Sequence, residues 1–81
     1  MTAMPSPEVY VGGITLIDEG RVRIREVDRE GRVLAIVQGT SEMHAVRRSA
    51  AGRWTCTCQT GQYGRACRHR EAVRMVTRAK P

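Results

Sequence analysis

The segment Trp54-Thr55-Cys56-Thr57-Cys58, followed after eight residues by Cys67-Arg68-His69, decides how this chain of 81 residues folds. Alternate residues of a β-strand face the same side, so a strand over the first segment directs Cys56 and Cys58 to one place. Residues two apart on a helix diverge by about 200°, so Cys67 and His69 fit the start of a helix and not its middle. The segment therefore predicts a seam where a strand passes into a helix.

The four side chains at this seam have the chemistry of a metal site. Zinc (Zn²⁺) prefers a tetrahedron of sulfur and nitrogen ligands, and a site closed by four protein ligands is structural because water has no position in it. Gly61 and Gly64 allow the loop between the two pairs to fold back tightly. We predict one structural zinc ion held by Cys56, Cys58, Cys67 and His69.

Other uses of the cysteines fit less well. Three cysteines would leave one thiol over in a disulfide framework, and iron–sulfur clusters usually take four cysteines. The remaining alternative is three buried cysteines beside an unrelated surface histidine. A metal also suits the size of the chain, because small domains often need a staple of this kind.

The order Cys56-x-Cys58, a glycine-containing gap and Cys67-x-His69, with Trp54 ahead of it, resembles the SWIM zinc finger. The resemblance covers about residues 43–79, with His44-Ala45-Val46 as the first strand of the motif. It implies a ββα arrangement, zinc binding, and contacts with DNA or with other proteins. It does not extend to the first 42 residues.

The hydrophobic pattern predicts an α+β domain over residues 9–81, a small antiparallel sheet of three to five short strands followed by one C-terminal helix and stapled by the zinc. Residues 21–25 alternate arginines with Val22 and Ile24, which is typical of a strand with one face inward. Residues 33–37 are apolar on both faces and fit a central strand, and residues 43–48 fit a further strand.

The two ends of the chain are predicted from weaker patterns. Residues 9–11 and 14–17 have strand character that Gly12-Gly13 interrupts, and residues 1–8 fit a disordered lead-in. At the other end, a helix over about residues 68–79 carries one apolar stripe. The stripe consists of Ala72, Met75, Val76 and Ala79.

The net positive charge lies entirely in the half with the cysteines. Residues 1–40 hold five arginines and six acids, whereas residues 41–81 hold nine basic residues and two acids. Such asymmetry favours a polyanionic partner. We predict nucleic acid, DNA in preference to RNA, bound by arginines of the loop and helix. These are Arg65, Arg68, Arg70, Arg74 and Arg78. A solvated helix face is the alternative.

A second hypothesis is an adaptor that docks on a larger nucleic-acid-processing protein, through an acidic surface of that protein or through an apolar patch of this chain. The patch would comprise Val9, Val11, Ile14 and Ile17. A third is a redox or zinc sensor, since oxidising the thiolates would release the metal.

Several side chains and functions remain to be placed. His44 is expected at the sheet surface, with a spare-ligand or titrating role as the alternative; Trp54 is expected to pack over the site, and Tyr63 to be free to stack on a base. We find no catalytic constellation and expect neither an enzyme nor a small-molecule substrate. With no apolar stretch of about 20 residues and no signal peptide, we expect a cytoplasmic protein without membrane contact.

Overall fold

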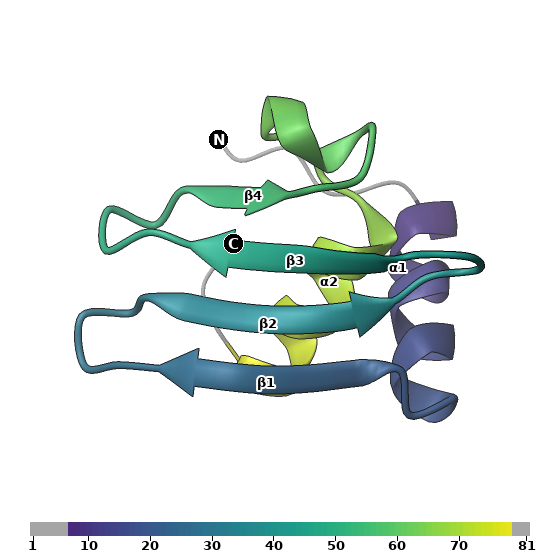
Figure 1. Ribbon diagram of the computed structural model, residues 1–81, viewed down its shortest axis with the longest axis horizontal. Helices are drawn as coiled ribbons and strands as arrows, with labels where there is room; N and C mark the ends of the chain where they lie inside the picture. Colours follow the sequence, from purple (N-terminus) through teal and green to yellow (C-terminus); the bar gives the residue numbers. More distant parts are fainter. Residues whose placement is uncertain (1–6, 79–81) are drawn as a thin grey trace.

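Four antiparallel strands in the order β1-β2-β3-β4 form one sheet, and two helices lie behind it (Figure 1). The computed structural model describes residues 7–78. Its elements are α1 (Pro7–Asp18), β1 (Val22–Val27), β2 (Val33–Gln38), β3 (Met43–Arg48), β4 (Trp54–Cys56), the 3-10 helix η1 (Gly61–Tyr63) and α2 (Arg68–Thr77). The predicted antiparallel sheet followed by a C-terminal helix is confirmed.

The central strand is the one that the sequence indicates. β2 pairs with β1 on one side and with β3 on the other, and its residues alternate between buried and half-buried. Val33, Ala35 and Val37 face the helices and join the core, together with Val46 and Trp54 from the neighbouring strands. The outer face of β2 is apolar as well, because β2 lies between β1 and β3 and its outer side chains are half-buried between their neighbours.

The predicted strand over residues 9–17 is wrong, because this segment is the helix α1. Gly12-Gly13 does not interrupt an element; it allows α1 to approach α2. A Cβ atom at Gly13 would lie 2.9 Å from Cε of Met75 and 3.0 Å from the backbone nitrogen of Ala72. Contact between the helices, together with burial of Leu16 in the core, outweighs the strand propensity of the β-branched residues.

α2 begins where the sequence predicts, but its buried face differs. Ala72 and Val73 are fully buried, whereas Val76 is 44% exposed. The predicted stripe therefore includes Val76 wrongly and misses Val73. The reason is that α2 contacts both the sheet and α1, so that buried residues occupy a wider arc than one stripe.

Two predictions concern residues at the ends of the chain. The lead-in predicted at residues 1–8 lies mostly outside the described residues, and Pro7 and Glu8 form the start of α1. Ala79, the last residue of the predicted stripe, is also outside them. Within residues 7–78, no helix is both long and apolar enough to cross a membrane.

Candidate metal centre

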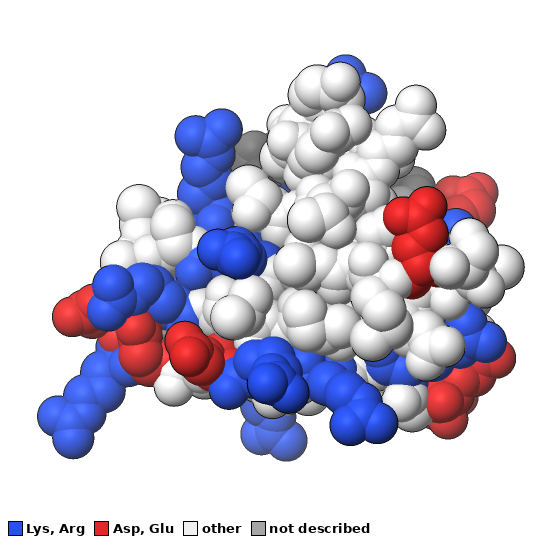
Figure 2. Space-filling model, in the orientation of Figure 1, with Lys and Arg blue, Asp and Glu red and all other residues white. Residues whose placement is uncertain are grey.

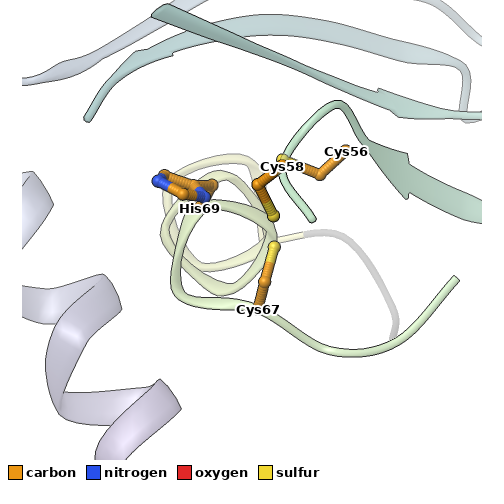
Figure 3. Close-up of side chains that lie close together, drawn as sticks. All are labelled: Cys56, Cys58, Cys67 and His69. Carbon is orange, nitrogen blue, oxygen red and sulfur yellow. The ribbon is translucent and has the colours of Figure 1, made fainter. Parts of the chain in front are cut away.

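The four predicted ligands come together where β4 passes into α2. Cys56 is the last residue of β4, Cys67 is the N-cap of α2, and His69 lies in the first turn of that helix. Their ligand atoms and that of Cys58 all lie within 4.8 Å of one another. Figure 3 shows the sulfur atoms of Cys58 and Cys67 directed towards each other, with His69 on the adjoining turn of helix.

This cluster fits a zinc ion in donor type and in size. Four ligands about 2.0–2.3 Å from one ion lie roughly 3.5–4 Å apart in a tetrahedron, so the cluster needs only small adjustments. All three cysteines are free of disulfides. Nδ1 of His69 is buried and has no hydrogen-bond partner among the described residues. An orphaned ring nitrogen beside three sulfurs is expected where a metal completes the group.

The electrostatics of the cluster favour one thiolate before any metal binds. A hydrogen bond from Cys56, with smaller contributions from the side chain of His69 and the backbone N–H of Arg70, lowers the pKa of Cys67 to about 4. Donating that hydrogen bond to Cys67, together with burial, raises the pKa of Cys56. Cys67 is thus a ready anionic ligand, whereas Cys56 must lose its proton when a metal binds.

Backbone N–H groups hold two of the sulfurs in place. The N–H of Gly61 donates to Sγ of Cys58 (3.2 Å), and the N–H of Arg70 donates to Sγ of Cys67 (3.4 Å). A Cβ atom at Gly61 would collide with Cβ of Cys56. Gly64 has a left-handed backbone (φ 78°) at the end of η1, where glycine is favoured. The two glycines of the predicted loop therefore have separate functions.

His44 lies against the metal centre and not at the sheet surface, where it was expected. Its ring lies 4.4 Å from the ring of His69, centroid to centroid, and its Nδ1 lies 3.3 Å from Oγ1 of Thr57. His44 is half-buried beside the site and is not part of the donor cluster. The signal was present in the sequence, because His44 lies two residues from Val46, which pairs with Cys56, and period two places both on the ligand face.

The two aromatic residues near the site differ in exposure, as their positions in the sequence predict. Trp54 is only 3% exposed, which confirms that it packs in the core. Cζ of Arg48 lies 5.9 Å from the centroid of the Trp54 ring. Tyr63, in η1, is 74% exposed. Trp54 is thus part of the fold, and Tyr63 is open to a partner.

Residues 37–73 match the family model of the SWIM zinc finger. This segment of the chain is similar to a SWIM zinc finger. The match includes all four ligands and covers β3, β4, η1 and more than half of α2. In this chain the SWIM-like segment is part of a larger fold, because β1 extends its sheet and α1 packs on its helix. No curated protein and no solved structure matches the chain.

The arginines predicted to bind nucleic acid differ in exposure, three being exposed and two half-buried. Arg65 and Arg78 are exposed, and Arg78 ends α2 in a left-handed conformation (φ 55°). Arg68 is also exposed, and its side-chain carbons lie against Gly12 of α1. These three arginines keep their charges available.

Of the other two predicted arginines, Arg74 binds a buried carboxylate and Arg70 lies close to it. The side chain of Glu71 is 2% exposed, and its Oε1 lies 2.8 Å from Nη2 of Arg74. Its Oε2 lies 3.9 Å from Nε of Arg70. The side chains of Arg70 and Arg74 are themselves only 17% and 22% exposed. Part of the predicted basic row therefore serves the internal ion pair.

Proposed function

We propose that this chain is a non-catalytic module that binds nucleic acid through arginines, with the zinc site holding α2 against the sheet. The observation that best supports this proposal is the excess of basic over acidic residues. The chain has a formal net charge of +6, and its single zinc site with three thiolates and a neutral histidine would itself be −1. Neutralising that site needs one arginine, so a large positive excess remains for a partner.

The structure supports this proposal through the state of the arginines. Arg65, Arg68 and Arg78 are exposed around the zinc finger, and further exposed arginines lie on the sheet. Protein arginines contact phosphates through bidentate, charge-assisted hydrogen bonds. Phosphate contacts fix a protein on nucleic acid but carry no sequence information. We therefore expect binding that is electrostatic and weakly selective for sequence.

The test is fluorescence anisotropy of the zinc-loaded protein with duplex DNA, single-stranded DNA and RNA of random sequence. We expect affinity to fall linearly in log–log form as salt rises, with a slope of about −0.9 for each duplex phosphate neutralised. Absence of binding to every polymer at low salt would refute the proposal. Zinc content measured on the same sample excludes loss of the fold as the cause.

A protein-docking function is the second candidate, and one observation favours it. Tyr10, Val11 and Ile14 on α1 are 45%, 58% and 39% exposed, and they form an apolar face directed away from α2. Of the four patch residues predicted from sequence, Val9 and Ile17 are half-buried instead. The variant Val11→Asp/Ile14→Asp would abolish docking on a protein and leave nucleic-acid affinity unchanged.

A further inference from the structure

The outer face of the sheet, which neither α1 nor α2 covers, carries a set of arginines outside those predicted from sequence. Figure 2 looks onto this face and shows basic groups over β1 and at the end of the sheet with the β1–β2 and β3–β4 turns, with some acidic groups among them and an uncharged area beside them. Arg23 on β1 lies opposite Ile36, and Arg47 on β3 lies between Leu34 and Thr55. Period two places these residues opposite the core.

Two more arginines flank this face. Arg25 falls where the register of β1 and β2 shifts between Ile24 and Glu26, and such bulges redirect a side chain. Arg53 immediately precedes the buried Trp54 of β4, so alternation directs it outward. We call Arg23, Arg25, Arg47 and Arg53 the sheet arginines; all four are exposed.

The sheet arginines, like Arg65, Arg68 and Arg78, are exposed, whereas two arginines close to them bind other groups of the chain. Arg48 donates to the carbonyl of Gly31 (2.7 Å), and Arg32 pairs with Asp28 and Glu30. Within residues 7–78, by contrast, no sheet arginine forms an ion pair. Four guanidinium groups are thus held on a rigid sheet with their charges uncompensated by direct contact.

Three of these arginines converge on one hollow. Arg25, Arg47 and Arg53 line an open depression of about 820 Å³ whose floor includes Leu34. Five arginines and two acids line this hollow, which leaves a net charge of +3. One of those acids, Asp28, is bound by Arg32, and this contact lowers its pKa. The hollow therefore suits an anion that extends over the surface.

The side chains of the face also indicate the form of the partner. Single-stranded nucleic acid is held by bases stacked on aromatic rings, and none of the described residues that line the hollow is aromatic. A duplex keeps its bases stacked internally and presents two rows of phosphates. Strands β1 and β3 are two strand spacings apart, about 9.6 Å, which is close to the ~12 Å width of the major groove of B-DNA.

We propose that the outer face of the sheet is the principal contact surface for duplex DNA, with the sheet arginines bound to its phosphates. This inference rests on the proposed nucleic-acid function and names its surface. The zinc site then lies on the opposite face of the sheet. There, α2 and the zinc ligands hold β3, which carries Arg47, and β4, which Arg53 precedes. The exposed arginines of the loop and helix lie outside this principal surface.

The test compares two triple variants that remove equal charge. One is Arg25→Gln/Arg47→Gln/Arg53→Gln on the sheet, and the other is Arg65→Gln/Arg68→Gln/Arg78→Gln around the zinc finger. Zinc content and circular dichroism establish that each is folded. We expect the sheet variant to bind duplex DNA at least tenfold more weakly at low salt, with the salt slope reduced by about one for each phosphate that the variant no longer binds.

Each outcome separates this inference from the proposed function. A larger loss of affinity in the sheet variant than in the zinc-finger variant supports the inference. An equal or larger loss in the zinc-finger variant overturns it while the nucleic-acid function stands. Tighter binding of single strands or duplex RNA than of duplex DNA by the unmodified protein overturns the choice of partner. No binding by the unmodified protein refutes the proposed function itself.

Discussion

At the scale of single residues, Cys67 combines two functions that a substitution can separate. Its Sγ caps α2 by accepting the N–H of Arg70, and its thiol has a pKa lowered to about 4, chiefly by a hydrogen bond from Cys56. In Cys67→Ser the hydroxyl keeps the cap but supplies no thiolate. We expect this variant to lose bound zinc, measured as zinc per chain by mass spectrometry of the purified protein.

His44→Ala is the matched control for that measurement. His44 packs against His69 but lies outside the donor cluster, so we expect His44→Ala to retain one zinc per chain. Complete loss of zinc in this variant, or retention in Cys67→Ser, would show that the ligand set is wrong.

Glu71 gives a second prediction at this scale. Its carboxylate is buried against Arg74 and Arg70, and losing a hydrogen bond to a charged group costs about 1.5–3 kcal/mol. We expect Glu71→Gln to lower the free energy of unfolding by about that amount, measured by urea denaturation of the zinc-loaded protein. Glu42→Gln removes an exposed acid and should change it by less than about 0.5 kcal/mol.

The burial of Glu71 could not be predicted from the sequence. A glutamate flanked by arginines three residues on and one residue back is typical of a solvated helix face. Only the packing of α1 across α2, which places Glu71 beside Gly13, turns that face inward. The ligands, in contrast, could be predicted because their spacing and chemical type are written in two short segments.

At the scale of elements, α1 depends on close contact with α2. A Cβ atom at Gly13 would press on Met75, Ala72 and Glu71 at 2.9–3.2 Å. Overpacking of this kind costs about 1–3 kcal/mol, so we expect Gly13→Ala to lower the free energy of unfolding although alanine favours helix. Val11→Ala, at an exposed position of the same helix, is the control. Stabilisation by Gly13→Ala would mean that the helices do not approach closely.

The contact between α1 and α2 also explains why the strands can be predicted from the sequence and α1 cannot. β1, β2 and β3 follow from period two and from turn residues, which are local signals. α1 contains β-branched residues and two adjacent glycines, so its local preferences oppose a helix. Short isolated helices are marginal, and most helices in proteins are stabilised by packing. Packing against α2 therefore stabilises α1 as a helix. The local sequence of residues 7–18 does not indicate this contact.

At the scale of the whole molecule, the zinc ion joins parts that have few other connections. The cluster ties β4 to α2, while α1 packs on α2 and β1 completes the sheet. Structural zinc sites contribute about 10–16 kcal/mol in zinc-finger peptides, which exceeds the stability of most domains of this size. We expect a chelator to abolish helical circular dichroism at 222 nm, and added Zn²⁺, but not Mg²⁺, to restore it.

The pH dependence of zinc affinity follows from the two shifted thiols. At neutral pH Cys67, with its pKa lowered to about 4, has already lost its proton. Cys56, whose pKa is raised, has not. Zinc binding therefore releases at least one proton, and affinity must fall as pH falls, about tenfold per pH unit for each proton released.

Competition titrations with a chromogenic chelator between about pH 6 and 8, a range in which both thiols keep these states, would measure this slope. A slope of zero would mean that Cys56 does not bind the metal as a thiolate, and it would leave the proposed tetrahedron one ligand short.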